Sequence, residues 1–215
     1  MIGLMMKMSK VEIIEDYLDE LFKEPKCELN YNNDYELLIA IVLSAQTTDK
    51  RVNSVTPILF NKYNSLEKLM NADIKDIEDI LRPLGSFRKK ALYVKEIARI
   101  LFLDYEGKVP IKRSELETMP GVGRKTVNVF LGEFYNIPAI AVDTHVERVS
   151  KRLGLAKESD AVRSVEEKLK RKFKREDWAK RHLQLVLFGR YHCKAVSPNC
   201  DNCKLSSICK YKKRS

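Results

Sequence analysis

The 215-residue chain has few of the residues that interrupt regular structure: it contains 8 glycines and 7 prolines. An all-β protein needs frequent turns, so this scarcity argues against one. No apolar run approaches the ~20 residues that a membrane-spanning helix requires. The first ten residues, MIGLMMKMSK, are interrupted too soon for a secretory signal. We therefore expect an intracellular protein that has no membrane partner.

The positive charge of the chain is confined to one region. The formal net charge is +10, from 40 Lys and Arg against 30 Asp and Glu. Residues 151–215 hold 19 basic and 7 acidic side chains, a net of +12, whereas residues 1–150 hold 21 and 23, a net of −2. This asymmetry indicates either a polyanionic partner, most often nucleic acid, or a solvated lysine-rich surface.

Apolar residues recur with the period of a helix along most of the chain. One such stripe consists of Ile14, Tyr17, Leu18, Leu21 and Phe22. Alternating strand patterns are missing, so the sequence predicts an all-α fold with short connections. The predicted helices cover residues 35–45, 49–63, 87–104, 125–135, 144–153, 160–173 and 176–188.

The segment LETMPGVGRKTVNVFL, residues 116–131, predicts two helices joined by a tight turn. The first helix should end at Met119, because Pro120 discourages its continuation. The two turn glycines allow backbone angles that other residues avoid. Main-chain N–H groups exposed at the start of the second helix can bind a phosphate without regard to base sequence. An ordinary helix connection is the alternative, but the flanking residues fit a helix-hairpin-helix DNA-binding motif.

A carboxylate follows at Asp143, in the segment VDTHVERV. Asp143 precedes a predicted helix, so it could simply cap that helix. Thr144 and Glu147 also have the spacing of a capping box, which would leave Asp143 available for chemistry.

Together the two segments resemble the endonuclease III family of base-excision DNA glycosylases. The resemblance implies that Lys125, which follows Pro-Gly-Val-Gly-Arg, is the nucleophile, and that Asp143 is the essential carboxylate. A lysine amine can attack C1′ of a damaged nucleotide, expel the base and form a Schiff base, after which β-elimination cleaves the strand. The carboxylate can stabilise positive charge on the sugar and assist proton transfer.

Four cysteines lie close together near the end of the chain, spaced C-x6-C-x2-C-x5-C: Cys193, Cys200, Cys203 and Cys209. They could bind one metal centre, and zinc is a serious alternative because four thiolates suit its tetrahedral geometry. The spacing resembles the iron–sulfur loop of the endonuclease III family, which implies a [4Fe–4S] cluster with a structural role. Cys27 is left over and is interpreted as a small core residue.

The segment Ser44-Ala-Gln-Thr-Thr-Asp49 also resembles the family, in which the glutamine fills the gap left by a flipped nucleotide. Gln46 is the candidate for that role, with Asp49 as its support. The other wedge loop departs from the family pattern, because Ser86 stands where a bulky apolar residue is common. Either Phe87 supplies the wedge instead, or intrusion into the DNA is weaker. Glu117 matches an acidic family position without an assigned role. The resemblance implies DNA contacts by Gln46, Phe87, Gly121, Val122, Gly123, Arg124, Thr126, His145 and Lys194.

The resemblance implies a two-lobed fold with a central helical barrel at residues 32–140, which contains the hairpin 116–131. Residues 1–31 plus 141–215 would form a discontinuous helical domain that carries the cysteine loop, 193–209. DNA should lie across the cleft between them.

The expected activity is that of a bifunctional glycosylase and apurinic/apyrimidinic (AP) lyase that removes oxidised pyrimidines. Its partner would be double-stranded DNA with damaged bases or abasic sites, and the protein a monomer in the cytoplasm or at the nucleoid. The alternatives are a mismatch glycosylase for uracil or thymine, and a DNA-binding module without catalysis.

Overall fold

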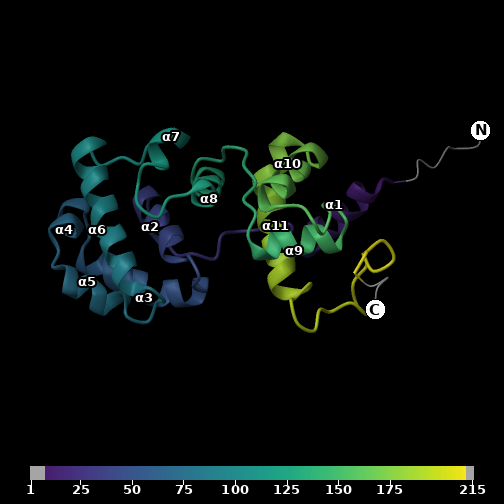
Figure 1. The fold of residues 1–215 in the computed structure, drawn as a ribbon, viewed down its shortest axis with the longest axis horizontal. Coiled ribbons are helices and arrows are strands. Elements are labelled where there is room, and N and C mark those ends of the chain that lie inside the picture. The colour runs from purple at the N-terminus through teal and green to yellow at the C-terminus, as the bar shows by residue number, and fades with distance from the viewer. Residues whose placement is uncertain (1–7, 212–215) are drawn as a thin grey trace, which may run out of the picture. The chain divides into compact units, whose positions relative to one another are not determined.

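The computed structural model describes residues 8–211. Most of the N-terminal segment weighed above as a secretory signal lies outside this range, as do the last four residues of the basic segment. The described residues are helical and contain no β-strand, which confirms the predicted all-α class (Figure 1). Among their helices, none combines the length and apolarity that crossing a membrane would demand.

The chain divides into two compact units. One comprises Cys27–Asn136 and is called the hairpin unit below; the other comprises the residues up to Lys26 and those from Ile137 onward, and is called the cysteine unit. Each unit has its own apolar core.

The hairpin unit is built around a long helix, α6, and a buried one, α2. Residues 36–43 of α2 are all buried, which explains why that segment is almost continuously apolar. Helix α6 packs against α4, α5 and α2, and α2 packs against α8 (Figure 1). The helices are α2 (Asp34–Leu43), α3 (Asp49–Lys62), α4 (Leu66–Asn71), α5 (Ile74–Leu81), α6 (Phe87–Asp104), α7 (Arg113–Leu116) and α8 (Arg124–Phe134).

The cysteine unit joins the two ends of the chain. Its helices are α1 (Lys10–Leu21), α9 (Thr144–Arg152), α10 (Val162–Lys172), the short 3-10 helix η1 (Arg175–Asp177) and α11 (Trp178–Tyr191). Helix α11 packs against both α9 and α1 (Figure 1). The buried Gln184 fastens α11 to α1, because its amide donates to the carbonyl oxygens of Leu18 and Phe22 at 3.2 and 2.9 Å. The predicted stripe is confirmed, since Ile14, Tyr17 and Leu18 are buried in this core.

Candidate functional site

The hairpin turn connects α7 to α8. Helix α7 ends at Leu116, so the prediction that it continues to Met119 is wrong. The chain tightens instead, because the amides of Thr118 and Met119 bond to carbonyls three residues back, at 3.3 and 3.1 Å. The buried side chains of Met119 and Val122 then anchor the turn to the core.

Close packing against two helices fixes the turn at Gly121. Its φ is +77°, in the left-handed region, and a Cβ there would lie 2.7 Å from the Tyr93 ring and 3.0 Å from the Val42 side chain. Gly123 differs: a Cβ at this position would meet no atom within 4 Å. The protein's own packing therefore requires glycine at 121 and leaves space beside 123.

Helix α8 starts directly after this turn, with Gly123 as its N-cap residue. A glycine has no side chain with which to cap the helix, so first-turn N–H groups of α8 are available to an external acceptor. Lys125, its second residue, is exposed, whereas Val127 and Phe130 on the opposite face are buried. The buried face fixes the helix, and the helix directs the lysine outward.

The neighbours of Lys125 follow the same division between exposed and buried faces. Arg124 is exposed and Thr126 is half-buried. Glu117, which has no role assigned from the sequence, forms an ion pair with Arg113 at 3.1 Å, and Arg113 also bonds to the Asn128 side chain. The bond from Arg113 to Asn128 ties α7 to α8.

Gln46 lies in an exposed turn between α2 and α3, with a φ of 54°. Ser86, the N-cap residue of α6, has a φ of 56°. Left-handed backbone is costly for residues other than glycine, so each turn must be held by its surroundings. Phe87 is half-buried against the core of the hairpin unit, and the Arg88 guanidinium lies over its ring at 5.0 Å.

Asp143 is the N-cap residue of α9. Its Oδ1 accepts hydrogen bonds from the amides of His145 and Val146, at 2.9 and 2.8 Å. The alternative cap at Thr144 is therefore wrong, and Glu147 pairs with Lys151 at 2.5 Å instead of closing a capping box. Both bonds end on Oδ1, so capping itself leaves the second carboxylate oxygen to other partners.

His145 follows in the first turn of α9, against Gly189 of α11. A Cβ at Gly189 would lie 2.8 Å from the His145 Cβ, so the two helices touch there. Burial lowers the pKa of His145, and the charges of Arg148 and Arg190 lower it further, while Asp143 acts in the opposite direction. The close packing fixes the start of α9, and with it Asp143.

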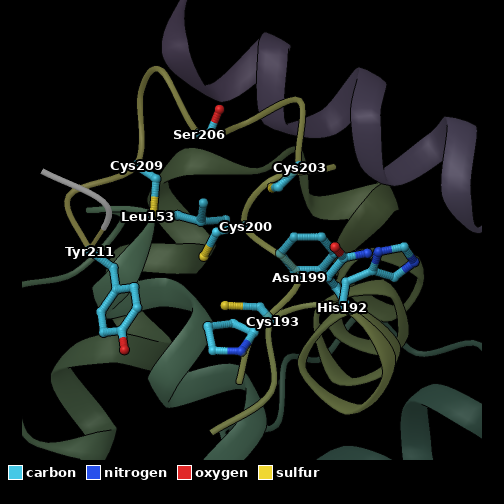
Figure 2. Close-up of a pocket in the computed structure, with 11 residues that line it drawn as sticks. Leu153, His192, Cys193, Asn199, Cys200, Cys203, Ser206, Cys209 and Tyr211 are labelled. Carbon is cyan, nitrogen blue, oxygen red and sulfur yellow. The ribbon is translucent and has the colours of Figure 1, made fainter. Parts of the chain in front are cut away.

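The four predicted metal-binding cysteines line one pocket of the cysteine unit, together with Leu153 and Tyr211 (Figure 2). All four cysteines are half-buried, and none of them forms a disulfide. Burial raises the pKa of the Cys203 thiol, and the other three sulfurs raise it further. Within residues 8–211, no group of three or more His, Cys, Asp and Glu side chains is arranged as a site for one metal ion.

Helix α9 also reaches the cysteine loop, through two arginines one turn apart. Arg148 Nε donates to the Cys193 carbonyl at 3.2 Å, and Arg152 donates to the Lys194 carbonyl at 2.7 Å. The backbone carbonyl of Arg152 in turn accepts from the Cys209 thiol at 3.3 Å. Neither arginine is among the residues predicted from the sequence, although their i, i+4 spacing in the helix that follows Asp143 was a signal.

The structure brings the predicted residues together in two groups. Gln46, Phe87, the hairpin turn and Lys125 belong to the hairpin unit. Asp143, His145, Lys194 and the four cysteines belong to the cysteine unit. Lys194 is exposed, and Cys27 is half-buried against the core of the hairpin unit.

Comparisons with known proteins match nearly the whole chain. Residues 39–175 match the family described as HhH-GPD superfamily base excision DNA repair protein. Endonuclease III of Bacillus subtilis (strain 168) is 44% identical over 206 residues, covering 96% of this chain and 94% of the relative. Endonuclease III of Escherichia coli (strain K12) is 38% identical over 210 residues, covering 98% and 99%.

Comparison with solved structures leads to the same family. A trapped covalent intermediate of endonuclease III with DNA has a TM-score of 0.91 at 43% identity and covers 97% of this chain and 99% of that one. A thermostable thymine-DNA glycosylase, with a TM-score of 0.85 at 22% identity, shares the fold. The chain therefore belongs to the endonuclease III family, DNA glycosylases with AP lyase activity within the HhH-GPD superfamily of base excision repair proteins.

Proposed function

We propose that this protein removes damaged pyrimidines from duplex DNA with Lys125 as the nucleophile and Asp143 as the essential carboxylate. The observation that carries the proposal is the exposed amine of Lys125, in the first turn of an N-terminally uncapped helix directly after the glycine turn. A phosphate bound to that turn would bring a backbone sugar near the amine.

Double-stranded DNA is the proposed partner. Two solved endonuclease III structures, each with a TM-score of 0.91, are a covalent and a non-covalent complex with DNA. The open space beside Gly123 suits a close approach of the DNA backbone. The excess of basic side chains from residue 151 onward would add attraction that does not depend on base sequence.

In the proposed reaction the neutral amine of Lys125 donates its electron pair to C1′ of the damaged nucleotide. The bond from C1′ to the base breaks, and the base leaves with the electron pair of that broken bond and takes up a proton. Ring opening gives a Schiff base between Lys125 and C1′, and loss of a C2′ proton then expels the 3′ phosphate. The Asp143 carboxylate, held by two backbone amides, would face the positive charge that develops on the sugar.

The cysteine pocket suits a [4Fe–4S] cluster, with a structural zinc ion as the alternative. Cys193, Cys200, Cys203 and Cys209 supply four thiol ligands around one half-buried pocket, and their spacing along the chain resembles the iron–sulfur loop of the family. Such a cluster would offset the mutual repulsion of four thiolates and stabilise the C-terminal loop. Because Arg148 and Arg152 of α9 bond to carbonyls of this loop, an ordered loop would also stabilise α9, whose first turn is capped by Asp143.

The two units would correspond to the two domains of this enzyme. Oxidised pyrimidines are the proposed lesions, and Gln46 with Phe87 would fill the space that the extruded nucleotide leaves. Extrusion is required because a stacked base shields C1′. The mismatch glycosylases share this fold, so lesion preference is decided by the experiment below.

The test is borohydride trapping on a panel of duplexes that carry an oxidised pyrimidine, an abasic site, or uracil or thymine opposite guanine. We expect wild type to form a covalent adduct with the first two. Lys125→Ala should form none, while Lys75→Ala, which removes an exposed lysine of the same unit, should react as wild type. Release of mispaired bases without any adduct would instead support a mismatch glycosylase.

The cofactor has its own test. Anaerobically purified protein should be brown and contain four iron atoms per chain. Zinc in place of iron would overturn the proposed cluster. Binding of DNA without release of any base would overturn the proposed catalysis.

A further inference from the structure

A buried lysine joins the two turns that are proposed to enter DNA. Lys90 lies one turn into α6 and is 5% exposed. Its Nζ donates a hydrogen bond to Oγ1 of Thr47, the residue after Gln46, at 2.7 Å. The amide of Lys90 makes the regular first-turn helix bond to the carbonyl of Ser86, the N-cap residue, at 3.1 Å. The Lys90 side chain therefore ties the Gln46 turn to the first turn of the helix that begins at the Ser86 turn.

The contact continues to the backbone at Gln46. The Thr47 hydroxyl donates to the Ala45 carbonyl at 3.4 Å, and the Thr47 amide donates to the Ser44 carbonyl at 3.0 Å. The Ala45 carbonyl belongs to the peptide plane that precedes Gln46, so holding it restricts the φ of Gln46. This φ is 54°, a conformation that is costly for glutamine and needs such support.

Stability alone does not explain a lysine at this position. Burial lowers the pKa of Lys90, which means that the folded protein holds this ammonium at a cost. The contact that offsets this cost is a neutral hydroxyl, whereas an apolar side chain would fill the site without charge. The retained charge is best explained by the hydrogen bond that it directs to the Gln46 turn.

The hairpin turn rests on the same two helices. Tyr93, which follows Lys90 by three residues on α6, and Val42, at the end of α2, are the side chains that a Cβ at Gly121 would meet. The Gln46 turn, the Ser86 turn and the hairpin turn are thus all anchored where α2 and α6 meet in the hairpin unit.

We propose that Lys90 is a positioning residue that, through Thr47, locks the Gln46 turn to the Ser86–Phe87 turn, so that both enter the DNA stack as one rigid element. This inference rests on the proposed function, because it assumes that these turns fill the gap beside an extruded nucleotide. Lys90 itself touches neither the base nor the sugar.

The test compares Lys90→Met and Thr47→Val, which remove the two ends of the hydrogen bond, with two controls. Thr47→Ser keeps the hydroxyl. Lys95→Met removes another lysine of α6, whose Nζ bonds to the Ala72 carbonyl at 2.6 Å, away from the Gln46 turn. The probe is a duplex with a tetrahydrofuran abasic analogue opposite 2-aminopurine, whose fluorescence rises when it unstacks. Hydrogen exchange of the amides of residues 45–47 is measured in parallel, without DNA.

We expect Lys90→Met and Thr47→Val to slow 2-aminopurine unstacking at saturating protein by roughly tenfold, because a hydrogen bond to a charged group contributes about that factor. Amide exchange at residues 45–47 should accelerate in both variants. Thr47→Ser and Lys95→Met should unstack and exchange as wild type, even if Lys95→Met lowers the melting temperature as much as Lys90→Met does.

Equal unstacking and equal exchange in Lys90→Met and Lys95→Met would overturn the inference. So would wild type that binds the duplex without unstacking 2-aminopurine, even if borohydride trapping succeeds. Failure of trapping with accelerated exchange in Lys90→Met would overturn the proposed function and leave the coupling of the two turns intact.

Discussion

The two units hold their proposed active-site residues in opposite ways. In the hairpin unit the backbone is fixed, by Gly121 against Tyr93, while the Lys125 side chain is exposed. In the cysteine unit the functional group itself is fixed, because the Asp143 carboxylate accepts from two backbone amides. A nucleophile must travel to form a bond, whereas a carboxylate that stabilises charge works best when it is already oriented.

Removal of the proposed iron–sulfur cluster should give the largest difference in behaviour between the two units. Because the four cysteines belong to the cysteine unit, we expect chelation of the cluster to increase hydrogen exchange in α9 and α11 by orders of magnitude. Exchange in α2 and α6 should stay within about threefold, since those helices have a separate core. Equal loss of protection in both units would contradict the division between them.

The substitution Asp143→Asn should distinguish the helix-capping role of Asp143 from its proposed role in catalysis. Asparagine caps helices as well as aspartate, so the free energy of unfolding should change by less than about 0.5 kcal/mol. Loss of the charge should lower the single-turnover rate of base release by about 10²–10³-fold. Asp143→Ala should show the same rate and lose about 1 kcal/mol of stability in addition.

Asp73→Asn is the matched control for this experiment. Asp73 is the N-cap residue of α5, in the hairpin unit, and its side chain accepts from the Lys75 amide at 3.0 Å. The substitution should change neither stability nor rate appreciably. An Asp143→Asn enzyme as active as this control would show that Asp143 only caps α9.

The two turn glycines should respond differently to the same substitution. Gly121→Ala places a Cβ 2.7 Å from Tyr93 at a positive φ, and should lower the free energy of unfolding by about 2 kcal/mol or more. Gly123→Ala should cost about 1 kcal/mol or less, because its Cβ meets nothing and alanine is only a poorer N-cap residue than glycine. It should nevertheless weaken DNA binding, measured by fluorescence anisotropy. If the Gly123→Ala protein is stable and binds DNA as tightly as wild type, the DNA phosphate does not bind at the hairpin turn.

The smallest expected effect is a pH dependence from His145. Its pKa is lowered in the folded protein, so the unfolded chain binds more protons and the stability contribution is lost as pH falls. The loss should begin near the unfolded value of about 6.5 and be complete below the folded pKa. Chemical denaturation of His145→Gln should lack this component. If the free energy of unfolding changes with pH in the same way in the variant and in wild type, His145 makes no such contribution.

The sequence predicted the helices well where burial follows a simple period. The stripe at Ile14, Tyr17 and Leu18 and the apolar segment of α2 each specify one buried face, and the structure confirms both. The end of α7 was harder to predict, because the tightened turn to Met119 satisfies backbone groups almost as a helix does.

Local sequence could not decide between Asp143 and Thr144 as the cap of α9, since both residue types cap helices well. The Lys90–Thr47 bond joins residues 43 positions apart, and no periodic pattern predicts such a contact. The left-handed backbone of Gln46 and Ser86 could not be predicted either, because neither residue is a glycine. These features depend on how the helices of the hairpin unit pack against one another.

The position of the trapped bond tests most directly whether Lys125 is the nucleophile. Wild type is reduced with borohydride on an abasic duplex, the DNA is digested to the linked sugar, and the protein is mapped by peptide mass spectrometry. We expect the added mass on Lys125 alone. Added mass on another amine, such as Lys90 or the N-terminus, with Lys125 unmodified, would contradict it.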